Sequence, residues 1–345
     1  MTLKVLTVLA GAPVGGAETF FVSLTAALAN AGLDMRSVLK ANAHREAALA
    51  GQGVMYATAP FQSFLDFSTG ATLRRMAHDF RPDVVLAFAG RAASFLPRGP
   101  HVRIGRLGGY YNLDNFRQCD ELVCNAPDLV RYVTNGGWPQ ERVSLIPNFP
   151  ALADGPKLDR AAFDTPEDAP LALALGRLHP AKGLDTLIRA AASLPGLFVW
   201  IAGEGPEREN LQRLTQDFGL GPRIRFLGWR NDRASLFKTA DVCVYPSREE
   251  PFGNVVVEAW ACGTPLVTAA STGPRWLVRD GEDALMIPVD DVQALAAGIG
   301  RLLASPALRA SLAAAGRRRV AEDFSEPAIV ARYIDLFKRV TGKTH

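Results

Sequence analysis

The sequence predicts an α/β protein with two domains, each built around a parallel β-sheet, and three observations support this fold class. Short apolar runs alternate with amphipathic stretches, as in the run 3–10 and the helical pattern at 17–31 that follows it. The same alternation restarts at Leu171, after a stretch at 151–170 that is rich in Pro, Asp and Ala. With 345 residues and 48% hydrophobic content, the chain is long enough to bury two cores.

The predicted organisation comprises a first domain, a linker, a second domain and a C-terminal helical segment: 1–150, 151–170, 171–325 and 326–345. The linker assignment rests on composition, because segments with little periodicity and many turn-forming residues commonly connect domains. In the last segment Ile329, Tyr333 and Phe337 recur at helical spacing. We therefore expect an amphipathic helix there that buries its apolar face.

Composition excludes several classes of function. The formal net charge of +3 is too small to indicate a nucleic-acid partner, although it permits weak attraction to an anionic membrane surface. The four cysteines, at positions 119, 124, 243 and 262, show neither the close pairs of a zinc site nor the density of a disulfide scaffold. Reduced thiols in a cytoplasmic protein are therefore expected.

No apolar run approaches the roughly 18–20 residues that a membrane-spanning helix needs. The opening segment 1–12 shares one Lys, an apolar run and small residues with signal peptides. Its apolar run is short, however, and a helical pattern starts with Gly15-Gly16-Ala17-Glu18 directly after it. A buried first strand is the better interpretation, and any membrane contact is expected to be peripheral.

The stretch 245–274 places two acids at one edge of the predicted second sheet. An apolar strand ends at Tyr245, a polar loop carries Glu250, and a helical run with Glu258 leads to a further strand from Pro265. Ligands bind beyond the carboxyl ends of the strands in such sheets. Both acids are therefore expected near a ligand.

The helix start in this stretch suits an anion, whereas the two acids suit hydroxyl groups. The backbone N–H groups of 253–256 lie in the first turn, where the helix dipole is positive and favours a diphosphate. Glu258 can accept hydrogen bonds from a ribose diol, and Glu250 can accept them from sugar hydroxyls. A nucleotide sugar, anionic at its centre and hydroxylated at both ends, meets these requirements.

The nine residues Glu-Pro-Phe-Gly-Asn-Val-Val-Val-Glu resemble the E-x7-E motif of retaining glycosyltransferases of family 4, which have the two-domain GT-B fold. Three further motifs follow the expected order and extend the resemblance over most of the chain: Gly15–Glu18, Gly176–Leu178 with Lys182-Gly183, and Gly203–Pro206. The resemblance implies two Rossmann-like domains that face each other across a cleft. It also implies that the last helix crosses back to the first domain.

Candidate ligand contacts lie on both predicted domains. Arg177 and Lys182 follow one strand and can clamp a diphosphate whose charge grows as the sugar leaves, although a solvated basic loop is the alternative. Gly15 and Gly16 allow close backbone approach to a ligand, although a plain strand-to-helix turn would also explain them. The resemblance favours ligand binding in both cases. It further implies donor contacts at Gly205, Phe252, Gly253, Asn254 and Val255.

One position departs from the resembled family. Many members carry a His about where Arg106 falls, and this His is thought to contact the donor sugar. We interpret His101 as an incidental residue, and we expect Arg106 or the backbone near Gly108 to replace the missing contact. An Arg there could pair with a phosphate or carboxylate of donor or acceptor.

The predicted function is that of a retaining hexosyltransferase. The donor would be a uridine- or guanosine-linked diphosphate sugar. The stretch from Glu250 to Trp260 is similar to bacterial enzymes that extend lipopolysaccharide cores, and this resemblance implies a glycan or glycolipid acceptor of the bacterial envelope. Arg177, Lys182 and Glu250 are the predicted catalytic residues. None of the motif residues is an obvious nucleophile, so we expect the front-face substitution that is proposed for the resembled family, in which the leaving phosphate helps remove the acceptor proton. Cations of the protein then neutralise the diphosphate, so no metal or other cofactor is required.

Two other functions use the same features. A nucleotide-sugar 2-epimerase of the same fold would isomerise a labelled nucleotide sugar in the absence of an acceptor. A non-catalytic nucleotide-sugar sensor would bind tightly without transfer or slow hydrolysis.

Overall fold

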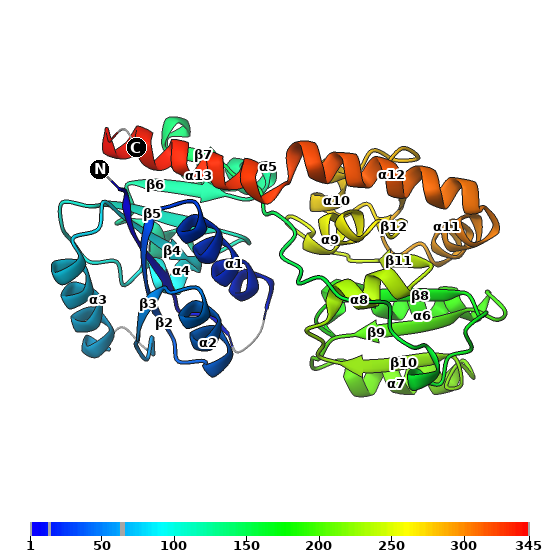
Figure 1. The fold of residues 1–345 in the computed structure, drawn as a ribbon. Helices are drawn as coiled ribbons and strands as arrows, with labels where there is room; N and C mark the ends of the chain where they lie inside the picture. Colours follow the sequence, from blue (N-terminus) through cyan, green and yellow to red (C-terminus); the bar gives the residue numbers. More distant parts are fainter. Residues whose placement is uncertain (1, 13–14, 63–65, 344–345) are drawn as a thin grey trace. The chain divides into compact units, whose positions relative to one another are not determined.

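The computed structural model describes residues 2–12, 15–62 and 66–343, and the chain divides into two compact units (Figure 1). The first unit comprises Met1–Asn148 together with Glu326–His345, and the second comprises Phe149–Ser325. Each unit has its own parallel sheet and its own buried core. The predicted α/β class with two Rossmann-like folds is confirmed.

A seven-stranded parallel sheet forms the centre of the first unit, in the order β3-β2-β1-β4-β5-β6-β7. The chain winds outward from β1 to β3 and then resumes beside β1 with β4, so the gap between β1 and β4 is the topological switch point. The strands span Lys4–Leu9 (β1), Asp34–Leu39 (β2), Met55–Thr58 (β3), Val84–Phe88 (β4), Val102–Leu107 (β5), Glu121–Cys124 (β6) and Val143–Leu145 (β7).

The helices of the first unit include the last helix of the chain. They span Gly16–Asn30 (α1), Ala43–Gly51 (α2), Phe67–Phe80 (α3), Ala89–Ala93 (α4), Pro127–Asn135 (α5) and Glu326–Thr341 (α13), with short turns at Leu113–Phe116 (η1) and Gln140–Arg142 (η2). α13 packs beside α1. Ile329, Tyr333 and Phe337 of α13 are 0% exposed, as their spacing predicts.

The second unit repeats this arrangement with six parallel strands in the order β10-β9-β8-β11-β12-β13. Successive residues of β8 point to opposite faces, so Ala172 and Ala174 enter one core while Leu171, Leu173 and Leu175 enter the other. The strands span Leu171–Leu175 (β8), Phe198–Ala202 (β9), Ile224–Gly228 (β10), Val242–Tyr245 (β11), Leu266–Ala269 (β12) and Leu285–Ile287 (β13).

Helices cover both faces of this sheet, which explains why its central strands β8 and β11 are apolar throughout (Figure 1). The helices and short turns span Ala161–Phe163 (η3), Pro180–Lys182 (η4), Leu184–Ala192 (α6), Arg208–Asp217 (α7), Arg233–Thr239 (α8), Asn254–Cys262 (α9), Thr272–Leu277 (α10), Val292–Ala304 (α11) and Pro306–Asp323 (α12).

The segment 151–170, which we predicted to be a linker, belongs to the second unit. Arg160 is 8% exposed, and its guanidinium donates to the carbonyl oxygens of Glu167, Ala169 and Thr239 at 3.0, 2.8 and 2.7 Å. Because this segment is irregular and is held by one buried Arg, its sequence shows no helical or strand periodicity. Its sequence therefore resembles that of a free linker.

Candidate functional site

The second unit brings two predicted site residues together at its topological switch point. β8 and β11 are neighbours in the sheet, and the loops that follow them meet at its carboxyl edge. Lys182 belongs to the loop after β8, and Glu250 belongs to the loop after β11. These two residues come from segments that are far apart in the sequence.

The backbones of these two loops are in direct contact. The amides of Arg248 and Glu249 donate to the carbonyl oxygen of Ala181 at 2.9 and 3.2 Å. Gly183 has a φ of +60°, and a Cβ at this position would lie 2.2 Å from the Pro246 carbonyl oxygen. Only glycine fits this close approach. The loops therefore form one connected surface.

The first turn of α10, which follows β12, also contacts the backbone of Glu250. The amide of Gly273 donates to the Glu250 carbonyl oxygen at 2.7 Å. A Cβ on Gly273 would lie 2.1 Å from the Phe252 carbonyl oxygen, so a larger residue would push the start of α10 away. The contact that holds the Glu250 backbone would thus be broken by a side chain at position 273.

The Glu250 carboxylate receives two donors on one oxygen. Lys182 Nζ lies 2.6 Å from Glu250 Oε2, and the Tyr245 hydroxyl donates to the same oxygen. The Lys182 and Glu250 side chains are 25% and 15% exposed, so solvent reaches this pair in part. Burial, together with the negative charge of Glu250, raises the pKa of the Tyr245 phenol well above its usual value. Tyr245 is therefore a neutral hydrogen-bond donor at physiological pH.

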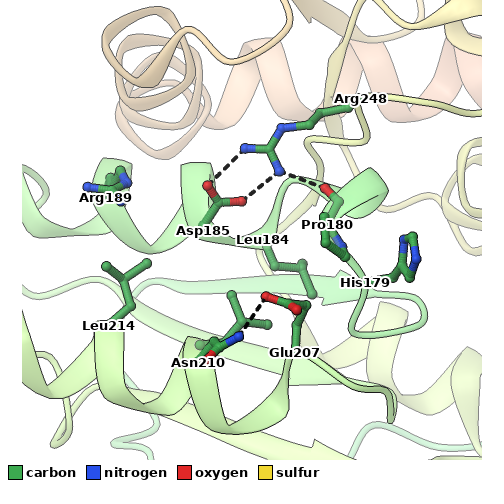
Figure 2. Close-up of a pocket in the computed structure, with 10 residues that line it drawn as sticks. His179, Pro180, Leu184, Asp185, Arg189, Glu207, Asn210, Leu214 and Arg248 are labelled. Atoms are coloured by element: carbon green, nitrogen blue, oxygen red, sulfur yellow. Dashed lines mark hydrogen bonds and ion pairs between the residues drawn. The ribbon is translucent and has the colours of Figure 1, made fainter.

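Arg248 connects the Glu250 loop to Pro180, to α6 and to Asp290, and Figure 2 shows its contacts with Pro180 and with Asp185 of α6. Its Nη1 and Nη2 atoms each donate to the Asp185 carboxylate at 2.8 Å, and Nη1 also donates to the Pro180 carbonyl oxygen at 2.6 Å. Its Nε donates to Asp290 at 2.7 Å, and Nη2 reaches the Thr186 hydroxyl at 3.4 Å. These contacts match the five N–H groups of a guanidinium.

Arg248 also lines a hollow of about 290 Å³ that Figure 2 shows between α6, α7 and the Lys182 loop. Asp185 and Arg189 line it from α6, and Asn210 and Leu214 line it from α7. None of the predicted site residues lines this hollow. The hollow is therefore distinct from the predicted site residues.

Arg177 belongs to the same loop after β8 as Lys182 and is exposed. A Cβ built on Gly176 would lie 3.8 Å from Lys182 Cδ, so the lysine stem runs past the residue that precedes Arg177. The Arg177 guanidinium makes no recorded hydrogen bond or ion pair with the residues that the structure describes, which leaves its donors available. The cationic residues Arg177 and Lys182 therefore both lie in the loop that follows β8 at the switch point.

The predicted helix start is present, but the side chains of Phe252 and Val255 are turned into the core. α9 begins at Asn254, after Gly253 with a φ of +107°. Phe252 and Val255 are only 2% and 9% exposed, so their side chains are not available to a ligand. Gly205 has a packing role, because a Cβ there would lie 2.3 Å from the Leu178 carbonyl oxygen. Ligand contacts by these residues remain a prediction that rests on backbone groups.

Glu258 is buried and paired. Its Oε1 atom lies 2.5 Å from Arg233 Nη1 of α8, and Arg233 Nη2 also donates to the Ala151 carbonyl oxygen at 3.0 Å. Burial raises the pKa of the Glu258 carboxyl above its ordinary value, although Arg233 acts in the opposite direction. Since the Glu258 side chain is 6% exposed, a ribose contact would have to share the carboxylate with Arg233.

In the first unit, the glycine loop after β1 is described only in part. Gly15 precedes α1 and Gly16 is its first residue, whereas positions 13 and 14 lie outside the described residues. The Ala12 amide donates to Glu18 Oε1 at 2.8 Å, and a Cβ on Gly15 would lie 2.3 Å from Glu18 Oε2. Gly15 therefore makes room for a carboxylate of the chain itself, and the contact of Gly15 and Gly16 with a ligand remains a prediction.

The prediction for Arg106 requires correction. Its side chain is 2% exposed, Nε donates to the Tyr333 hydroxyl at 3.2 Å, and Nη2 donates to Asn148. The guanidinium also lies 4.5 Å from the Phe20 ring centroid. A Cβ on Gly108 would lie 3.4 Å from Arg106 Nη1, so Gly108 packs near the same group. Arg106 is a buried structural residue of the first unit, because α13 supplies a partner that the local sequence does not reveal.

Tyr245 and Arg233 contact predicted site residues, and Arg248 joins the loop of Glu250 to the loop of Lys182, but we did not predict these three residues from the sequence. Tyr245 was assigned only to an apolar strand, and Arg248 only to a charged loop. The position of Tyr245 as the last residue of a strand that opens into the Glu250 loop is a signal that could have identified it.

Residues 157–319 match the model of a family described as "Glycosyl transferases group 1". The chain is 38% identical over 325 residues to the lipopolysaccharide core biosynthesis glycosyltransferase LpsE of Rhizobium meliloti (strain 1021), covering 93% of this chain and 95% of that protein. The chain belongs to the group 1 glycosyltransferases, which confirms that the predicted enzyme is a glycosyltransferase.

Among individual relatives, LpsD of the same strain is also a lipopolysaccharide core biosynthesis glycosyltransferase, 36% identical over 333 residues, covering 95% of this chain and 96% of that one. The structure of Anabaena Alr3699/HepE in complex with UDP and glucose is 21% identical, with a TM-score of 0.82 over 98% of this chain and 100% of that chain. WaaG, described as a glycosyltransferase involved in lipopolysaccharide biosynthesis, gives a TM-score of 0.74 at 17% identity over 97% of this chain and 99% of that chain. These likenesses establish the GT-B fold.

Proposed function

We propose that the protein is a retaining glycosyltransferase of family 4 that adds a hexose to a lipopolysaccharide core acceptor. The observation that carries this proposal is the Lys182–Glu250 pair at the switch point of the second unit, in a chain that is 38% identical to LpsE over 93% of its length. A cation and an acid on adjacent loops match a donor with an anionic diphosphate and a hydroxylated sugar.

In this proposal, Lys182 and Arg177 bind the diphosphate and stabilise the charge that grows on it as the sugar leaves. The exposed guanidinium of Arg177 offers a fork of donors, and the Lys182 ammonium offers a compact charge. Preorganised charge of this kind acts mainly on the transition state. Protein cations then supply the neutralisation, and no metal is invoked.

Glu250 binds hydroxyl groups of the transferred sugar, and Glu258 binds the ribose. Glu250 Oε2 is engaged by Lys182 and Tyr245, so a sugar hydroxyl would donate to Oε1. We propose front-face substitution, in which the leaving phosphate oxygen accepts the proton of the acceptor hydroxyl. The acceptor oxygen then forms its bond to the anomeric carbon on the face that the phosphate leaves, which retains the anomeric configuration.

The test is transfer from a labelled nucleotide sugar to truncated lipopolysaccharide cores, with the anomeric configuration of the product read by NMR. Retention supports the proposal, and inversion would refute the mechanism. Each donor is first incubated without an acceptor, because an epimerase would isomerise it under these conditions. Binding of donor without transfer to any core would favour the sensor instead.

The donor base is proposed to be uridine, because HepE was solved with UDP and with UDP-glucose on the same fold. A thermal-shift comparison of UDP with GDP tests this, since a ligand at 100 times its Kd stabilises a protein by roughly 2.7 kcal/mol. A larger shift with GDP would replace uridine by guanosine.

We propose that the enzyme works in the cytoplasm, at the inner face of the plasma membrane. Among the described residues, none of the helices has the length and apolar character needed to cross a membrane. A glycolipid acceptor would bring the protein to the lipid surface. Flotation with anionic liposomes at low salt tests this contact, and failure to float would argue against a lipid-borne acceptor.

A further inference from the structure

We propose that Tyr245 is a positioning residue for Glu250, which its hydroxyl keeps in a single orientation while Lys182 engages the donor diphosphate. This inference rests on the function proposed above. It assigns a role to a residue that none of the sequence motifs contains. The role is indirect, because Tyr245 acts through the Glu250 carboxylate.

The geometry gives Glu250 two donors with different freedom to move. Lys182 Nζ, at 2.6 Å, is carried on a flexible four-carbon stem in a side chain that is 25% exposed. Tyr245 is 3% exposed, and its ring lies among the buried residues around α9. The tyrosine therefore cannot leave Glu250 without disrupting the core, whereas the lysine can.

The backbone of Tyr245 is also fixed. It pairs with Thr268 of β12, whose hydroxyl donates to the Tyr245 carbonyl oxygen at 3.2 Å. Pro246 follows directly and is buried. The phenol hydroxyl is thus held at the end of a rigid strand, five residues before the carboxylate that it contacts.

The arrival of a diphosphate changes the balance between the two donors. A diphosphate carries more negative charge than one carboxylate. It therefore draws the Lys182 ammonium away from Glu250, or the ammonium donates some of its N–H groups to the diphosphate and the others to Glu250. The hydrogen bond from Tyr245 is then the remaining restraint on Glu250 Oε2. It keeps Oε1, which has no recorded partner among the described residues, directed toward a sugar hydroxyl.

The test is a double-mutant cycle with Tyr245→Phe, Glu250→Ala and the double variant, using kcat, KM and the Kd of UDP as readouts. Loss of a hydrogen bond to a charged group is expected to lower kcat roughly 10-fold or more in Tyr245→Phe. The Kd of UDP should change less than about 2-fold, because the diphosphate contacts remain. In the Glu250→Ala background, Tyr245→Phe should have almost no further effect on kcat, since its partner is absent.

Tyr333→Phe is the matched control, because it removes another buried phenol hydroxyl in the first unit and leaves Glu250 untouched. It should lower the Tm while leaving kcat near the wild-type value. Losses from Tyr245→Phe and Glu250→Ala that multiply in the double variant would overturn the positioning role while the proposed function stands. Absence of transfer by the wild-type enzyme with every donor would overturn both.

Discussion

Replacement of Arg233 by Met is expected to destabilise the second unit in a manner that depends on pH. Arg233 Nη1 lies 2.5 Å from Glu258 Oε1, and the two side chains are 24% and 6% exposed. Removing one partner of a buried pair costs about 3–5 kcal/mol, and the partial exposure of Arg233 places the loss near the lower end, about 3 kcal/mol. For a unit of this size the Tm should fall by about 6–12 °C.

The direction of the pH dependence follows from Glu258. Its carboxyl has a pKa raised above the ordinary value of 4.5 by burial, and loss of Arg233 raises it further. A group with a raised pKa in the folded state contributes stability that is fully present below its unfolded pKa and is lost as pH rises through its folded pKa. The deficit of Arg233→Met relative to wild type should therefore be largest above the raised pKa of Glu258 and shrink as the pH falls through it.

The assay is urea unfolding of wild type, Arg233→Met and Arg233→Met/Glu258→Gln across a pH range that includes this pKa. The double variant should recover most of the lost free energy of unfolding, because a neutral amide replaces the buried charge. Arg208→Met is the control, since its ion pair with Glu204 is exposed and such pairs contribute at most about 1 kcal/mol. A deficit that is equal at both ends of the pH range, or no recovery in the double variant, would refute the reasoning.

Three further predictions concern turnover and binding. Arg177→Ala, Lys182→Ala and Glu250→Ala should each lower kcat by at least roughly 10²-fold in the transfer assay. Near-normal rates in all three variants would refute the assignment of these residues as catalytic. Glu258→Ala should weaken UDP binding measured by calorimetry, whereas an unchanged Kd would remove its ribose role. Arg248→Lys should lower kcat roughly 10-fold and reduce the Tm, because an ammonium cannot reproduce five fixed N–H contacts; wild-type kinetics would show that the loop needs no such support.

The fold class could be predicted because parallel α/β sheets leave a strong record in sequence. Strands covered on both faces are apolar throughout, and the glycines at 176, 183 and 203 mark the tight connections at their ends. The loops with Lys182 and Glu250 could be placed together for the same reason, since both follow central strands. The structure confirms that these two residues meet.

The partners of the site residues could not be predicted, because they depend on side-chain packing between distant segments. Arg233 and Glu258 are separated by 25 positions and meet only because α8 and α9 pack together. Arg106 is separated from Tyr333 by 227 positions, so the sequence around it shows only a basic residue beside glycines. An exposed ligand contact and a buried structural Arg are indistinguishable at that level.

The discontinuity of the first unit has a consequence for its synthesis. Its final helix, α13, is translated after the whole of Phe149–Ser325, yet it supplies Tyr333 and Phe337, which are completely buried. The first unit therefore cannot complete its core on the ribosome until the second unit has emerged, and its nascent form exposes the apolar surface that α13 later covers. The second unit has no such dependence, because its residues are continuous in the chain.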